Sequence, residues 1–244
     1  EGDVAPASLL FTPADWDTPQ TVTVTGLPDA LTDGDVAYQI LTAAVLSDDP
    51  KYNSLDPDDV SVTNLDQDNA GITVTPTASL ATTEAGGTAS FTIVLDSQPT
   101  ADVTIGVASD DPSEGAVSPA SLTFTAANWS QPQTVTVTGQ DDFVDDGDVA
   151  FTIVTAAAVS SDPNYSGRDP ADVSVVNTDN DTAGITVTPT AGLTTTEAGG
   201  TASFTIVLDS QPTADVTIGV SSDNPSEGAA SPTSLIFTST NWNQ

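Results

Sequence analysis

The sequence contains no cysteine, histidine or methionine, and it has 2 basic side chains against 35 acidic ones in 244 residues. Without histidine and cysteine there is no imidazole base, thiolate nucleophile, nitrogen or sulfur zinc ligand, or disulfide framework. A serine nucleophile would have no general base other than a carboxylate. We therefore expect that the chain is not an enzyme.

The charge balance gives a formal net charge of −33 at pH 7. Nucleic acids and anionic membranes are bound mainly through Lys and Arg, so we expect neither as a partner, whereas cations are natural partners. No apolar run approaches the roughly 20 residues that span a bilayer, and we expect no membrane insertion. The first residues show neither Met nor a signal-peptide pattern, so we expect a segment of a longer protein.

An internal repeat with a period of 113 residues organises the chain. The segment that begins at Gly71 recurs almost unchanged from Gly184. The three tryptophans, Trp16, Trp129 and Trp242, are one position of the repeat seen three times. The whole sequence is therefore slightly more than two periods of one β-rich unit.

The five glutamates occupy only two positions of the repeat. One position holds Glu84 and Glu197, and the other holds Glu1, Glu114 and Glu227. The other 30 acidic residues are aspartates, concentrated in loops, where turn chemistry and metal ligation both favour the shorter side chain. Glu114 lies in a Ser-Glu-Gly turn, and we assign it no role beyond that turn.

Alternation of apolar residues with Thr or Ser predicts β-strands throughout one period, and no segment predicts a helix. Clusters of Gly, Pro, Asp and Asn separate the strands, a spacing typical of an antiparallel sandwich of about 100 residues. The fold class we predict is all-β, with tandem seven-strand antiparallel Ig-like sandwiches. The seven strands are expected around Val74 and over residues 89–95, 103–107, 122–124, 135–137, 151–153 and 173–175.

The strand order predicts one complete sandwich between two partial ones. Residues 70–181 form the complete domain, residues 1–68 the second part of a preceding sandwich, and residues 183–244 the first part of a following one. A partial sandwich exposes its apolar face and an unpaired strand edge. We therefore expect neighbouring repeats as partners. Either the chain continues in both directions, or copies associate head to tail into a filament.

Four short motifs recur in a fixed order along one period. They are TEAGG at 83–87, GQDDFVDDGD at 139–148, DND at 179–181 and the restart AGI at 183–185. Together these motifs resemble the Calx-β domain family, which was first recognised in sodium–calcium exchangers and is common in tandem in bacterial surface proteins. The resemblance covers the whole period, and it implies an extracellular or cell-surface location.

The resemblance also implies Ca²⁺ sites at one end of each sandwich, built from carboxylates of several loops. Pro28 replaces the counterpart of Asp141, so the site in residues 1–68 is expected to be weaker or to hold a single ion. The implied ligands are Glu84, Asp110, Asp141, Asp142, Asp146, Asp179 and Asp181 in the complete domain, Asp29, Asp33, Asp66 and Asp68 before it, and Glu197 and Asp223 after it.

General chemistry is compatible with calcium binding. Ca²⁺ takes six to eight oxygen ligands, and crowded carboxylates repel one another until a cation neutralises them. Asp179 and Asp181 lie in the linker before the next sandwich, so bound Ca²⁺ would fix the angle between domains. The alternative interpretation is that the aspartates only form turns and keep a salt-adapted surface soluble.

Two functions are consistent with these features. The near identity of the repeats favours a structural stalk or shaft of a bacterial extracellular filament or surface adhesin, rigidified by Ca²⁺ between domains. The alternative is an adhesive module that contacts carbohydrate or another cell surface, for which Trp129 would be the stacking platform. We expect Trp129 instead to pack against the sandwich.

Overall fold

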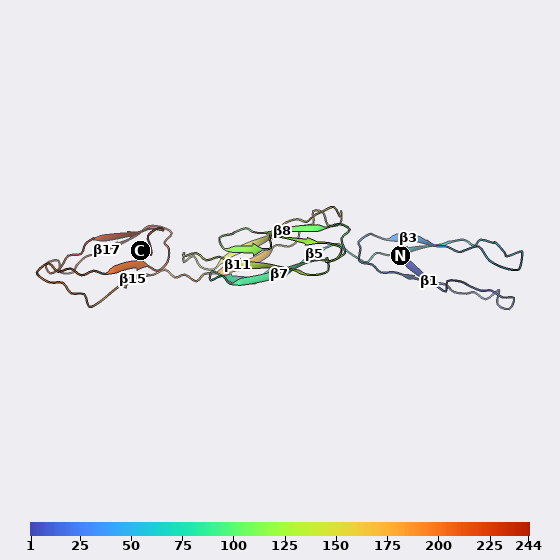
Figure 1. Ribbon diagram of the computed structural model, residues 1–244, viewed down its shortest axis with the longest axis horizontal. Helices are drawn as coiled ribbons and strands as arrows, with labels where there is room; N and C mark the ends of the chain where they lie inside the picture. The colour runs from blue at the N-terminus through green and yellow to red at the C-terminus, as the bar shows by residue number, and fades with distance from the viewer.

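The computed structural model describes residues 1–244 as an all-β protein. Three β units follow one another along one long axis (Figure 1). We call them the N-terminal unit (residues 1–68), the middle unit (residues 70–181) and the C-terminal unit (residues 183–244). The predicted all-β class is confirmed, and none of the secondary structure is a helix that could cross a membrane.

The middle unit is a sandwich of two sheets. The first sheet contains, in order, β10 (Ser121–Phe124), β8 (Val103–Ser109), β12 (Val149–Thr155), β14 (Val173–Thr178) and β6 (Leu80–Thr83), and β13 (Val159–Ser160) also pairs with β8. The second sheet contains, in order, β5 (Ile72–Thr75), β7 (Thr88–Leu95), β11 (Gln133–Gly139) and β9 (Gly115–Ser118).

The strand inventory of the middle unit differs from the predicted seven antiparallel strands. All seven predicted segments are strands, and the structure adds the short strands β6, β9 and β13. Strand β6 pairs with β14 in parallel. Strand β5 is antiparallel to β7, and Thr83 at the end of β6 forms an antiparallel bridge with Gly87, just before β7. The chain therefore crosses from the second sheet to the first between β5 and β6 without reversing direction.

The core of the middle unit follows from the alternation of its strands. On β7, Phe91, Ile93 and Leu95 are buried between the sheets, and the residues between them are only partly buried. Inward-facing residues of β8, β10, β11, β12 and β14 complete the same cluster. Tyr165 adds a polar tie, because its hydroxyl donates to the Ser97 carbonyl oxygen at 2.6 Å inside this core.

Each flanking unit consists of two two-stranded sheets that repeat strand pairs of the middle unit. The N-terminal unit pairs β1 (Gly2–Ala5) with β2 (Thr23–Gly26) and β3 (Val36–Ile40) with β4 (Val60–Asn64). The C-terminal unit pairs β15 (Ile185–Thr188) with β16 (Thr205–Leu208) and β17 (Val216–Gly219) with β18 (Ser234–Phe237).

Replacing Phe124 with alanine tests the core. Phe124 is fully buried, so we expect a loss of about 3 to 5 kcal/mol in the free energy of unfolding of the middle unit, measured by denaturant titration. Val159→Ala is the control, because Val159 is 73% exposed and its truncation leaves no cavity. Equal losses for the two variants would contradict the assigned core.

Candidate metal centre

A tight turn between β6 and β7 brings Glu84 to one end of the middle sandwich. Gly86 has a φ of +80°, a left-handed conformation that glycine adopts without steric cost. The N–H of Gly87 donates to the Thr83 carbonyl oxygen at 3.1 Å and closes the turn. The N–H of Glu84 donates to the Thr178 carbonyl oxygen at 3.1 Å. Glu84 therefore lies beside the end of β14.

The segment that follows β14 supplies two further carboxylates. Asp179 accepts the N–H groups of Asp181 and Gly147, each at 2.7 Å. Glu84 accepts the N–H of Asn180 at 3.0 Å. One carboxylate oxygen from each of Glu84, Asp179 and Asp181 lies within 4.8 Å of the other two. We call these three residues the Glu84 cluster.

A second cluster of carboxylates lies at the same end of the middle unit. Glu114, Asp142 and Asp146 each offer an oxygen within 4.8 Å of the other two, and we call them the Glu114 cluster. The N–H of Val144 donates to Asp142 at 2.7 Å in the loop between β11 and β12. The side-chain amide of Asn177 donates to Glu114 at 3.3 Å and holds that carboxylate from β14.

The prediction that Glu114 has no role beyond a turn is wrong, because its carboxylate belongs to this cluster. Its side chain is buried, whereas a residue that only forms a turn would be exposed. The signal that could have identified Glu114 is the recurrence of glutamate at Glu1 and Glu227, because only one other position of the repeat carries glutamate.

In the Glu84 cluster two carboxyl groups have raised pKa values and one has a lowered pKa value. Burial raises the pKa of Glu84 against the opposing hydrogen bond from Asn180, and the charge of Asp179 raises it further. Burial and the charge of Asp179 also raise the pKa of Asp181. The N–H groups of Asp181 and Gly147 lower the pKa of Asp179. Asp179 is therefore held as an anion next to two carboxyl groups that resist ionisation.

The Glu114 cluster also contains two carboxyl groups with raised pKa values. Burial raises the pKa of Glu114, and the charges of Asp146 and Asp111 raise it further. Burial, followed by the charges of Asp142 and Asp179, raises the pKa of Asp146. No basic side chain contributes to any pKa shift in either cluster. A cation is the partner that these charges lack.

Asp141 lies next to the Glu84 cluster without belonging to it. Its carboxylate accepts a hydrogen bond from the side-chain amide of Asn180 at 3.3 Å, and the same amide donates to Glu84 at 3.3 Å. Asn180 therefore links Asp141 to the cluster. It occupies a place where a further aspartate would add to the repulsion.

Three other predicted ligands lie outside the clusters. The carboxylate of Asp110 accepts the N–H of Thr152 at 2.7 Å, and the N–H of Asp110 donates back to the Thr152 carbonyl oxygen at 3.0 Å. Asp110 thus continues the pairing of β8 with β12. Glu197 and Asp223 are exposed in the C-terminal unit and share no carboxylate cluster there.

The N-terminal unit repeats the Glu114 cluster one period earlier. Asp66 accepts the N–H groups of Gly34 and Asp68 at 2.7 and 2.8 Å, as Asp179 does in the middle unit. A cavity of about 280 Å³ brings the predicted ligands of this unit together with a recurring glutamate. Its acidic lining is Glu1, Asp29, Asp33, Asp66 and Asp68, of which the first three form a cluster within 4.8 Å.

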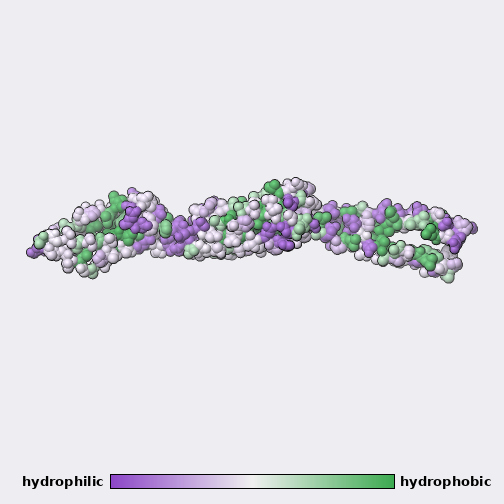
Figure 2. Space-filling view, in the orientation of Figure 1, coloured by the Kyte–Doolittle hydropathy of each residue, from purple (hydrophilic) through white to green (hydrophobic).

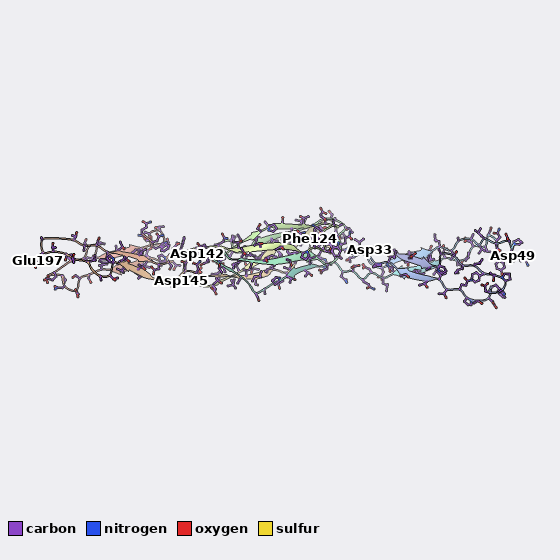
Figure 3. The ribbon with its side chains drawn as sticks, turned by 60° about the horizontal axis from the view of Figure 1, so that its bottom comes forward. Asp33, Asp49, Phe124, Asp142, Asp145 and Glu197 are labelled. Atoms are coloured by element: carbon purple, nitrogen blue, oxygen red, sulfur yellow. The ribbon has the colours of Figure 1, made fainter.

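The loop of residues 142–146 connects the Glu114 cluster to the C-terminal unit. The carbonyl oxygen of Phe143 accepts the N–H of Gln211 at 2.6 Å. The carboxylate of Asp145 accepts the N–H of Ala183 at 2.7 Å. Two seam contacts therefore lie between two cluster residues on one short loop. Figure 3 shows Asp142 and Asp145 at this seam, and Asp33 at the seam between the N-terminal and middle units.

The seam between the N-terminal and middle units repeats one of these contacts and adds others of its own. The N–H of Gln98 donates to the Ala30 carbonyl oxygen at 2.7 Å, one period before the contact of Gln211. The side-chain amide of Asn164 donates to the Thr32 carbonyl oxygen at 2.8 Å, and the hydroxyls of Thr32 and Ser97 lie 2.9 Å apart. Both seams thus use the loop that carries two cluster aspartates.

Trp129 and Trp242 occupy the same position of the repeat but make different contacts. Trp129 is partly buried and packs against the core, which confirms the expectation of packing. The ring of Trp242 lies 5.8 Å from the ring of Phe143 across the second seam. Ala30 replaces Phe143 one period earlier, so this aromatic contact belongs to the second seam alone.

The donor sets of both clusters suit a hard cation. Every donor is a carboxylate oxygen, the ligand type that Ca²⁺ prefers. Ligands on opposite sides of a Ca²⁺ with bonds of about 2.4 Å lie about 4.8 Å apart, so each set fits one coordination sphere. Asp181 Oδ2 is buried without a hydrogen-bond partner, as expected for an atom that ligates a cation.

No protein-family model matches the chain, and no curated protein matches it. Among solved structures it is similar to the apo-form Calx CBD1 domain, with a TM-score of 0.35 and 16% identity over 45% of this chain and 96% of that chain. It is also similar to domains 4 and 5 of the S-layer protein SbsC, with a TM-score of 0.29 and 15% identity over 66% of this chain and 84% of that one.

A third similar structure is the CsuC–CsuE complex of a chaperone and a tip adhesion subunit from the Csu pili of Acinetobacter baumannii. Its TM-score is 0.33, with 8% identity over 69% of this chain and 90% of that chain. At these identities the similarities concern the fold alone. With TM-scores of 0.35 and below they assign no family, and the Calx-β resemblance rests on the sequence motifs alone.

The raised pKa values lead to a test on protein kept free of metal with EDTA. Carboxyl groups with raised pKa values stabilise the fold fully below their unfolded values, 3.8 for Asp and 4.5 for Glu, and this contribution is lost as the pH rises through the folded values. Groups with lowered pKa values, such as Asp179, lose their contribution only as the pH falls below 3.8. We therefore expect the melting temperature to fall as the pH rises from about 5 to about 7.

The variant Glu84→Gln separates this effect from the pH dependence of stability that the rest of the protein contributes. It removes one raised carboxyl group, so its melting temperature should depend less steeply on pH than that of the parent protein. A parent melting temperature that is constant or rises over the same range would contradict the assigned repulsion.

Proposed function

We propose that the chain is a rod-like spacer segment of a cell-surface or extracellular protein, and that Ca²⁺ bound at the ends of its sandwiches stiffens the seams between units. One observation carries this proposal. The loop of residues 142–146 contributes Asp142 and Asp146 to a carboxylate cluster, while Phe143 and Asp145 contact the next unit.

The Glu84 and Glu114 clusters are the proposed ligand sets in the middle unit. Each would contribute three carboxylates, and water and nearby oxygen atoms would complete the six to eight ligands of Ca²⁺. The bound cation would supply the positive charge that the cluster lacks. Asp181 is the most informative ligand, because its Oδ2 atom is buried without a partner.

The coupling from metal to seam would act through the backbone. Ligation of Asp142 and Asp146 fixes both ends of a loop whose centre is hydrogen-bonded to Gln211 and Ala183 of the next unit. Without the cation, repulsion between the carboxylates favours conformations in which that loop spreads. The angle between the middle and C-terminal units would then vary more.

The shape and the surface support a spacer role. The three units lie in line, so the length of the protein grows with each repeat (Figure 1). A net charge of −33 keeps such a rod soluble and discourages lateral association. An adhesive role through a tryptophan platform has weaker support, because Trp129 packs against the core.

Calcium titration tests the proposal. Ca²⁺ at about 100 times its Kd would add about 2.7 kcal/mol to the stability of the middle unit, a rise in melting temperature of roughly 10 °C for a domain of this size. Small-angle X-ray scattering in Ca²⁺ and in EDTA should show a narrower distribution of lengths with Ca²⁺. Differential scanning calorimetry measures the first effect.

Two variants give the matched comparison. Asp142→Asn removes a cluster carboxylate and should reduce both the calcium-dependent melting shift and the stiffening. Asp102→Asn removes an exposed aspartate that lies outside every carboxylate cluster, and it should behave like the parent protein. No melting shift in the parent protein at millimolar Ca²⁺ would favour the alternative that the aspartates serve only turns and solubility.

A further inference from the structure

The chain enters the middle unit at one end and leaves it at the other. At the entry, the Gly71 carbonyl oxygen accepts the N–H of Asp96 at 3.0 Å, two residues before Gln98, which contacts the N-terminal unit. At the exit, Asp179 directly follows β14 and accepts the N–H of Gly147, beside the loop that contacts the C-terminal unit. Tension along the rod therefore pulls the entry and the exit of this unit in opposite directions.

The strands that begin and end this path run in one direction. Strand β5 begins just after the entry, and the chain continues into β6 without reversing direction. Strand β6 pairs in parallel with β14, the last strand before the exit. The strands of the middle unit lie along the long axis of the rod (Figure 1). Tension at the entry thus pulls β6 backward along its own length, and tension at the exit pulls β14 forward.

Strands β5 and β6 are each held by a single neighbouring strand. Strand β5 lies at the edge of the second sheet, where it pairs with β7, and β6 lies at the edge of the first sheet, where it pairs with β14. Strand β14 is held on both sides, by β6 and β12. If β5 separates from β7, residues 76–79 extend and the tension reaches β6. The pair of β6 and β14 then bears the two opposing forces directly.

We propose that the parallel pair of β6 and β14 is a mechanical clamp that keeps the middle unit folded when the rod is under tension. Hydrogen bonds of a strand pair run across the space between the strands, so a force along the strands strains all of them together. A force that parts the strands from one end breaks the same bonds one after another. The clamp goes beyond the spacer function proposed above and holds whether or not Ca²⁺ binds.

Backbone hydrogen bonds extend the clamp beyond both ends of β6. The register pairs Leu80–Thr83 with Val175–Thr178. Before this stretch, the N–H of Ser174 donates to the Thr77 carbonyl oxygen at 3.0 Å. After it, the N–H of Glu84 donates to the Thr178 carbonyl oxygen at 3.1 Å. More bonds therefore share the tension than the short strand β6 alone would provide.

A buried side-chain hydrogen bond adds to the clamp. Thr82 and Asn177 lie opposite each other in the register, and the Thr82 hydroxyl donates to Asn177 Oδ1 at 2.9 Å. Both side chains are 1% exposed, so this bond is screened from water, which weakens exposed hydrogen bonds. The amide of Asn177 also donates to the Gln140 carbonyl oxygen at 3.0 Å and anchors β14 to the segment after β11.

Optical tweezers test the clamp by pulling on the same bonds in two directions. The chain contains no cysteine, so two introduced cysteines give unique attachment points. The pair Asn69→Cys and Thr182→Cys pulls the entry and the exit of the middle unit apart and loads the clamp along its strands. The pair Ala85→Cys and Thr182→Cys parts β6 from β14 at one end. All three substituted residues are exposed, so both variants should retain the parent melting temperature.

At equal loading rate we expect the rupture force to be several-fold higher in the first direction than in the second. Both variants are measured in EDTA, so the result does not depend on calcium binding. A higher force in the first direction supports the clamp even where the parent protein shows no calcium-dependent melting shift. Equal forces in the two directions, or a higher force in the second, overturn the clamp.

A substitution at Thr82 tests the buried bond of the clamp. Thr82→Val, added to the Asn69→Cys and Thr182→Cys pair, removes the hydroxyl and nearly keeps the shape of the side chain. We expect the lifetime of the folded middle unit at constant tension to be roughly tenfold shorter, as for the loss of one buried hydrogen bond.

Tyr165→Phe in the same background is the matched control. It removes the buried hydroxyl that donates to the Ser97 carbonyl oxygen, a bond outside the clamp that is still intact when β6 leaves β14. Both substitutions should lower the melting temperature, but Tyr165→Phe should leave the lifetime under tension unchanged. An unchanged lifetime for Thr82→Val, or equally shortened lifetimes for both substitutions, overturns the clamp. The comparison of pulling directions needs neither substitution.

Discussion

The pairing between the first half of the middle unit, residues 71–113, and its second half, residues 114–181, is the constraint on which the rest of the structure depends. Strand β7 lies against β11, and β8 lies against β12, so each half covers the apolar face and the open edge of the other. The same pairing brings Glu84 from the first half to Asp179 and Asp181 from the second. The core and the Glu84 cluster are therefore consequences of one arrangement.

Charge crowding is the second consequence of this arrangement. The turn after β6, the loop between β11 and β12 and the segment after β14 converge at one end of the sandwich, and each of them is acidic. Backbone N–H groups hold Asp179 ionised and in place, and the equivalent groups do the same for Asp66. The other carboxylates of the middle unit are crowded against this fixed charge. Electrostatic repulsion between carboxylates is therefore concentrated where one unit meets the next.

Local patterns predicted much of the fold and part of the site. Alternation identified the seven principal strands, because side chains on successive residues of a strand point to opposite faces. It missed β6, β9 and β13, which have four residues or fewer and are defined by their partners. The resemblance placed Asp110 among the ligands, but its carboxylate bonds to Thr152. Glu114 was overlooked because its partners Asn177, Asp142 and Asp146 lie far from it in the sequence.

The sequence by itself determined the period, the β class and the excess of acidic loops, since repetition, alternation and net charge are properties of neighbouring or aligned residues. Only the tertiary structure decided which carboxylates share a cluster and which loop connects a cluster to the next unit. Those outcomes depend on distances between residues of separate strands. Such distances are set by sheet order and register, and no local stretch of the chain contains them.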